Sequence, residues 1–153
     1  MDIYAQLKKD HRKVQALFEE IMEYRDSTAK NVKTEVFALF EQLKLELDAH
    51  SKAEEKVLYA RIINEDATRE ITLEAEQEHR LVTQLLEELN ASKNTDERWF
   101  AKFAVLKEQV EHHVKEEEKD MFRKARKVLD KEEEEKLGHL MLAQKERMIA
   151  SLQ

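Results

Sequence analysis

The stretch His50-Ser-Lys-Ala-Glu-Glu-Lys56 returns later in the chain as His113-Val-Lys-Glu-Glu-Glu-Lys119. Both copies read H-x-K-x-E-E-K and place a histidine four residues before a glutamate. On an α-helix this spacing puts the imidazole and the carboxylate on one face, one turn apart. Such a pair from each of two helices is half of a dinuclear metal site in a helical bundle. The repeat therefore predicts helices that carry metal ligands.

The composition excludes sheet-rich folds. The chain has 153 residues, of which 40% are charged, with one glycine and no proline. Sheets need many tight turns, and tight turns are built largely from glycine and proline. We predict an all-α fold, an antiparallel up-down four-helix bundle over residues 1–128 with an additional C-terminal helix over 129–153. That last helix is expected to pack on the bundle or on a partner subunit, which leaves a homodimer open.

The net charge of the chain limits the classes of molecule that are expected to bind it. The formal net charge is -7, and an acidic chain gains little from phosphate contacts. We therefore expect neither nucleic acid nor an anionic membrane as a partner. No apolar run approaches membrane-spanning length, and the first residues lack a signal-peptide core. The absence of cysteine excludes disulfides and thiolate chemistry, and these features together fit a cytoplasmic protein.

Weak breaks divide the chain into long helices joined by short loops. The four helices of the bundle are expected at about 2–25, 32–63, 66–90 and 96–128, with the last loop between them at 92–96. Asp130 is expected to cap the terminal helix. The first turn of that helix is acidic, which suits the positive end of the helix dipole.

Each bundle helix has one apolar stripe at helical spacing, and each stripe is interrupted by ionisable residues. Counting from the loops, at about 1.5 Å of rise per residue, brings these groups to within about one turn of a common level. Unpaired in an apolar core, each would cost on the order of a few kcal/mol. We therefore predict that they bind a pair of metal ions. The predicted ligands are His11, His50, Glu54, His79, His113 and Glu117.

The donor set favours iron. Four imidazoles with two carboxylates and no thiolate suit two iron ions best, with manganese, a mixed pair or zinc as substitutes. The simplest arrangement gives each metal two histidines and lets Glu54 and Glu117 bridge between the metals.

These residues resemble the hemerythrin-like family of HHE cation-binding domains over residues 1–125. The matching pieces are His11 in KKDHRKV, His50 with Glu54, the pair Glu78-His79, and His113 with Glu117 in HVKEEEKDMF. The resemblance implies a non-haem di-iron centre, usually with an oxygen bridge between the irons. By this resemblance, one iron would be bound by His11 and His50 and the other by His79 and His113. Both glutamates would bridge the two irons.

The chain departs from the invertebrate oxygen carriers of that family at two positions. Ala75 stands where they have a second histidine on the third helix, and Glu117 stands where they have an aspartate. The closer likeness is to bacterial HHE proteins and to the iron-sensing domain of an F-box protein. Without that histidine, we expect protein ligands to leave open coordination positions on both irons, so peroxide or substrate would reach both. Glu76 or Glu78 on a metal would reverse this inference.

Three functions remain open on the sequence alone. The first is a di-iron protein that binds O₂ or NO, or that senses or handles iron and oxygen. The second is an oxidase, a peroxidase or a protein that repairs damaged iron centres under oxidative or nitrosative stress. Such an enzyme would need an external redox partner, because the chain has no thiol. The third is a metal-free helical interaction protein.

Other polar and aromatic side chains are expected to have structural roles. His112 points about 100° away from His113 around the helix, so we do not expect it to bind metal, and His139 on the terminal helix is expected to pack or to lie at the surface. Tyr4 and Tyr59 are expected to pack between helices, with hydrogen bonding near the metals as the alternative. The second glutamate of each repeat is expected to be solvated, and these residues are Glu55 and Glu118.

Overall fold

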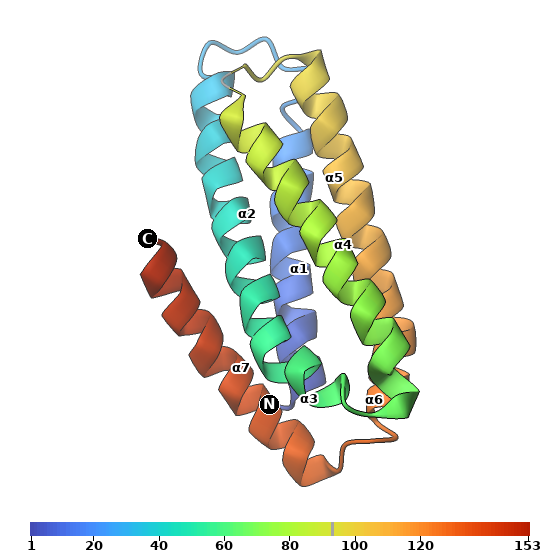
Figure 1. Cartoon of the computed structure of the whole chain (residues 1–153). Helices are drawn as coiled ribbons and strands as arrows, with labels where there is room; N and C mark the ends of the chain where they lie inside the picture. The colour runs from blue at the N-terminus through green and yellow to red at the C-terminus, as the bar shows by residue number, and fades with distance from the viewer. Residues whose placement is uncertain (93) are drawn as a thin grey trace.

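The computed structural model describes residues 1–92 and 94–153, and these residues form helices joined by short loops (Figure 1). The long helices are α1 (Ile3–Met22), α2 (Val32–Glu54), α4 (Asp66–Ala91), α5 (Glu97–Glu116) and α7 (Lys131–Leu152). No strand occurs in the two described ranges, which confirms the all-α prediction. The loop predicted at 92–96 includes residue 93, which lies outside the described residues.

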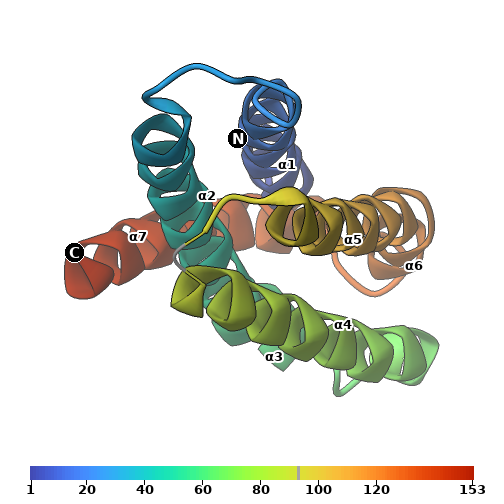
Figure 2. The same ribbon diagram turned by 90° about the horizontal axis from the view of Figure 1, so that it is seen from above.

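The helices α1, α2, α4 and α5 form an up-down bundle of two hairpins (Figures 1 and 2). The first hairpin pairs α1 with α2, and the second pairs α4 with α5. The terminal helix α7 crosses the outside of the first hairpin and packs on both of its helices. Within the described part of the chain, no helix is long and apolar enough to span a membrane.

Both copies of the repeat run into a π-helical turn that the sequence did not predict. The turn η1 (Glu55–Tyr59) follows α2 and leads into α3 (Ala60–Ile62), and the turn η2 (Glu117–Met121) follows α5 and leads into α6 (Phe122–Ala125). Single π-helical turns inside α-helices occur frequently at functional sites. Hydrophobic periodicity did not reveal η1, because Val57, Leu58 and Tyr59 are all apolar, so the stripe can be continued in either register.

The apolar core is divided into two clusters. One contains the aromatic rings of Phe18, Phe40 and Phe103. The other contains Leu58 and Phe122 together with residues of α1 and α7. Along every bundle helix, the predicted ligands lie between residues of the two clusters. The ionisable residues therefore form a polar layer that is closed by apolar side chains on both sides.

Polar contacts fix the position of α7 on the bundle. The Asp130 side chain accepts a hydrogen bond from the backbone N–H of Glu133, which confirms the predicted cap. The Tyr4 hydroxyl donates to Glu134 at 2.7 Å, and a cation from the end of the first hairpin, Arg61, pairs with Glu133. Tyr4 is thus bound to the terminal helix, as a packing residue.

The only glycine of the chain lies where α7 crosses the chain start. A Cβ atom on Gly138 would overlap the carbonyl oxygen of Met1, and it would lie 2.6 Å from the carbonyl carbon of Asp2. The backbones of α7 and α1 therefore approach each other at a distance that only glycine permits.

We expect Gly138→Ala to lower the free energy of unfolding by about 1–3 kcal/mol, the usual cost of overpacking. In an exposed helix the same change would stabilise by up to about 1 kcal/mol, so the sign is diagnostic. Urea unfolding followed by circular dichroism measures the effect, with Glu146→Ala at an exposed position of α7 as the control. A more stable Gly138→Ala protein would mean that α7 moves away from α1 without cost.

Candidate metal centre

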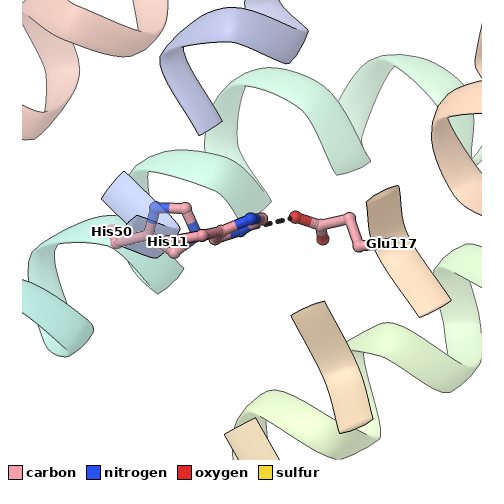
Figure 3. A group of neighbouring side chains, drawn as sticks. All are labelled: His11, His50 and Glu117. Atoms are coloured by element: carbon pink, nitrogen blue, oxygen red, sulfur yellow. Dashed lines mark ion pairs between the residues drawn. The ribbon is translucent and has the colours of Figure 1, made fainter. Parts of the chain in front are cut away.

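The six predicted ligands come together in the polar layer, and all of them are buried. Their ligand atoms form two groups, each with all its atoms within 4.8 Å of one another: His11, His50 and Glu117, and Glu54, His79 and His113. In Figure 3, Glu117 reaches across the bundle toward the imidazoles of His11 and His50. We call His11 with His50 the first half-site, and His79 with His113 the second half-site.

Each glutamate faces one histidine of each half-site. The Oε1 of Glu117 lies 3.1 Å from Nε2 of His11, and its Oε2 lies 3.4 Å from Nε2 of His113. The Oε1 of Glu54 lies 3.5 Å from Nε2 of His50 and 3.2 Å from Nε2 of His79. Both carboxylates therefore stand where they would bridge two cations, one in each half-site.

Several of these inner atoms lack a well-formed hydrogen bond among the described residues. They are Nε2 of His11 and of His50, both oxygens of Glu54, and Oε1 of Glu117. Their close approaches bring opposite charges together but do not have hydrogen-bonding geometry. Buried polar atoms are nearly always satisfied in folded proteins, so a group of unsatisfied ones needs a reason. Cations bound between the half-sites would satisfy all of them at once.

Each histidine is held from outside by a carboxylate at its Nδ1. In the first half-site, Nδ1 of His11 lies 2.6 Å from Glu118 and Nδ1 of His50 lies 2.8 Å from Asp10. A proton shared with the carboxylate belongs on Nδ1, which leaves the lone pair of Nε2 pointing inward.

The second half-site repeats this arrangement. Nδ1 of His79 lies 2.7 Å from Glu55, and Nδ1 of His113 lies 2.7 Å from Glu78. The four Nε2 atoms therefore converge, and binding a metal would require each of these imidazoles to be neutral.

The outer carboxylates follow a pattern that is visible in the sequence but that we misread. His11 and His79 lie outside the two repeats, and we call them the lone histidines. The acid directly before each lone histidine, Asp10 or Glu78, holds the histidine of the neighbouring repeat. The second glutamate of each repeat, Glu55 or Glu118, holds the lone histidine of the neighbouring helix. The prediction that these second glutamates are simply solvated was wrong. Glu55 is exposed and Glu118 is half-buried, so an amphipathic pattern alone assigns both to the surface.

The Tyr59 hydroxyl also reaches the centre, which is the alternative that the sequence left open beside simple packing. It donates to Oε2 of Glu117 at 2.8 Å and lies 3.4 Å from Nε2 of both His79 and His113. Burial, followed by Glu117 and Glu54, raises the pKa of Tyr59 well above its ordinary value, so the phenol keeps its proton. The turn η1 delivers this residue, whereas Phe122 stands at the equivalent position of the second repeat.

Tyr59 also bears on the gap predicted at Ala75. Ala75 is buried in the same apolar cluster as Tyr59. Glu78 binds the outer nitrogen of His113, and no hydrogen bond or ion pair within the described ranges involves Glu76. The extra oxygen beside the second half-site is therefore a phenol, and neither of these acids. That neither iron is filled by protein stays a prediction, with the Tyr59 hydroxyl as the additional oxygen beside the second half-site.

The remaining histidines lie at the surface, outside the candidate metal centre. His139 is exposed on α7, and the His112 side chain is 63% exposed. Nε2 of His112 lies 3.4 Å from Glu116 and 3.8 Å from Glu78, so these three residues form a separate exposed group.

A small cavity of about 20 Å³ adjoins the half-sites. Its walls are the four histidines with Ser51 and the apolar residues Val14, Leu47, Val82, Val110 and Val114. A space of this size holds about one water-sized molecule. An outer groove of about 760 Å³ between α2 and α4 shares Ser51 and His79 with this cavity. The groove therefore borders the outer side of the second half-site.

The electrostatics of the layer favour positive charge between the half-sites. Burial alone would lower the pKa of His50, but Glu54 and Asp10 outweigh burial and raise it to about 10. Burial would likewise raise the pKa of Glu117, but His11 and His113 hold it well below its ordinary value. Protons and metal cations therefore compete for the same atoms.

This fold and this set of inner donors define a helical-bundle cation-binding protein. The hemerythrin HHE cation binding domain family matches residues 2–125, and the chain belongs to this family. The crystal structure of an HHE cation binding domain-containing protein from Mycobacterium kansasii is similar, with a TM-score of 0.83 and 29% identity. The similarity covers 99% of this chain and 89% of that chain.

A protein of Nostoc sp. named as a DNA nickase is 30% identical over 138 residues. This stretch is 88% of the present chain but 36% of the Nostoc protein. The chain thus spans about a third of the length of that relative, so the likeness concerns the shared domain alone.

Replacing an outer carboxylate should weaken metal binding without removing an inner donor. We expect Glu118→Gln and Glu55→Gln each to lower metal affinity by about 10–100-fold, the usual effect of losing such a partner. Competition with a chromophoric chelator measures the affinity. Glu111→Gln on the exposed face of α5 is the control and should match the wild type. Wild-type affinity in both variants would show that the outer contacts do not orient the imidazoles.

Because protons and metal ions compete for the same atoms, we expect metal affinity to rise with pH and the stability of the metal-free protein to fall with pH. With Co²⁺ as the probe metal, the affinity should increase about tenfold per pH unit for each proton that the metal displaces, as the pH rises from about 6. In the metal-free protein, the raised pKa of His50 stabilises the fold below 6.5, and this contribution is lost as pH rises toward about 10. Chelator competition and urea unfolding across this range measure the two trends. A metal affinity that does not change with pH would contradict this account.

Proposed function

We propose that the chain binds two iron ions, one in each half-site, and that this centre binds O₂ or NO. The observation that carries the proposal is the inner geometry, in which each of two carboxylates faces one histidine of each half-site. Imidazole and carboxylate donors without thiolate suit iron, with manganese or zinc as substitutes. The proposed ligands are His11, His50, Glu54, His79, His113 and Glu117.

The size and lining of the cavity support a diatomic ligand. Its volume of about 20 Å³ accommodates O₂ or NO but not an organic substrate. The side chains of Val14, Val82 and Val110 give it apolar walls, which disfavour charged molecules. These residues therefore act by excluding bulk water and larger ligands from the inner nitrogens.

Iron in the half-sites would supply an open coordination position and a change of oxidation state. The chain's own residues hold this chemistry in place. The outer carboxylates fix the imidazoles, and the Tyr59 hydroxyl stands 2.8 Å from Glu117 as a hydrogen-bond donor at the centre. A donor in this position stabilises negative charge that develops on a nearby ligand.

The same hydroxyl favours a second candidate function. An oxidase or peroxidase needs a proton source beside the centre, and buried Tyr59 holds a proton there. A protein that delivers iron to damaged centres also belongs to this class. Electrons would come from an external redox partner, because the chain has no cysteine. The DNA nicking named for the Nostoc relative is not part of the proposal, since a net charge of -7 disfavours phosphate contacts.

The test is to purify the protein from iron-replete cells, quantify its metals, reduce it without air and then add O₂. A visible spectrum that appears with O₂ and reverses under vacuum supports binding. Irreversible oxidation, or turnover with peroxide, supports the enzyme. A protein that retains no stoichiometric metal would overturn both.

Matched variants connect the result to the site. His50→Ala and Glu117→Ala should each lose metal, because each removes an inner donor. His112→Ala is the control, since its side chain is 63% exposed and its ring lies outside the centre. It should retain wild-type metal content.

A further inference from the structure

The two half-sites differ in what lies behind their outer carboxylates. Asp10 and Glu78 occupy equivalent places, each before a lone histidine and each bound to Nδ1 of the other histidine in its half-site. The Asp10 side chain is 10% exposed, and its second oxygen accepts from Nζ of Lys145 at 2.6 Å. The Glu78 side chain is 22% exposed, and its second oxygen lies 3.8 Å from the exposed His112 ring.

Lys145 is a buried cation that belongs to neither hairpin. It projects from α7, its side chain is 11% exposed, and it pairs with Asp10 at 2.6 Å and with Glu46 at 2.7 Å. Glu46 in turn pairs with Lys13 at 2.6 Å. A lysine is seldom buried unless it is paired, and here two carboxylates fix its ammonium group from two helices.

The position of Lys145 is set by the rest of α7. Contacts of Glu133 with Arg61 and of Glu134 with Tyr4 fix the start of this helix, and Gly138 fixes its distance from α1. The helix begins at Lys131, beyond the residues 2–125 that match the family. A continuous chain of contacts therefore runs from the terminal helix through Lys145 and Asp10 to His50.

We propose that Lys145 is a positioning residue that holds Asp10 against His50, and that it thereby makes the first half-site the tighter of the two metal positions. The inference rests on the proposed metal binding and names the element that regulates it. A groove of about 220 Å³ between α1 and α7, lined by Asp10, Lys13 and Lys145, explains why a tether is needed. Without the ammonium group, Asp10 has room to turn toward solvent and release Nδ1 of His50.

The test measures how fast each iron leaves the loaded protein when a strong chelator is added. We expect two phases in the wild type, the slow one from the first half-site. Lys145→Met should speed the slow phase by about tenfold or more, the lower range for loss of an outer partner, and leave the fast phase unchanged. Lys145→Arg should restore most of the slow phase. Lys136→Met, at an exposed position of α7, is the matched control.

Two further variants separate positioning from a general loss of structure. Asp10→Asn should speed the slow phase as Lys145→Met does, and combining both changes should add little, since they break one chain of contacts. Glu78→Gln should speed the fast phase instead. Mössbauer spectra of iron-loaded protein should show one altered quadrupole doublet in Lys145→Met and one unaltered.

The outcomes distinguish this inference from the proposed function. If the wild type retains two irons that leave at equal rates, or if Lys145→Met speeds both phases alike, the inference fails and the metal centre stands. The inference would also fail if the slow phase were unchanged in Lys145→Met. If the wild type retains no iron, the proposed function fails and this inference fails with it.

Discussion

The structure depends on the pairing of imidazoles with carboxylates in the middle of an apolar core. Each of the four histidines has a carboxylate at Nδ1 on its outer side and faces Glu54 or Glu117 with Nε2 on its inner side. Burying such groups without partners would cost a large part of a typical folding stability. The two apolar clusters above and below the layer supply the burial that offsets this cost and keep water out. The same imidazole–carboxylate pairs therefore make the buried layer stable and form the candidate metal site.

The two hairpins solve this problem in nearly the same way, and their differences bear on function. In both, an acid before the lone histidine and the second glutamate of the repeat hold the imidazoles. The symmetry is broken at two places. Tyr59 brings a hydroxyl to the centre where the other repeat has Phe122, and Lys145 stands behind Asp10 where Glu78 meets solvent. A site built from similar halves thus has two chemically different positions.

Much of the fold was predictable, because its signals are local. The lack of proline and the single glycine exclude sheets, and the apolar stripes locate the long helices to within a few residues. The π-helical turn η1 was missed, since the consecutive apolar residues Val57, Leu58 and Tyr59 fit a stripe in either register. The sequence left Tyr59 open between packing and hydrogen bonding near the metals, and only η1, which places its hydroxyl at the centre, decides between them. The roles of Glu55 and Glu118 were missed because both face outward on their own helices, and the histidines they hold lie on other helices.

The amino-acid sequence alone determined the helical bundle and the six ionisable residues that interrupt its stripes. Both follow from periodicity, which is a property of each helix by itself. Only the tertiary structure decided which carboxylate holds which imidazole, since every such pair joins two different helices. It also decided the role of α7, because the contact of Lys145 with Asp10 depends on where the terminal helix crosses the bundle. Spacing within one helix cannot encode a distance between helices that meet only after folding.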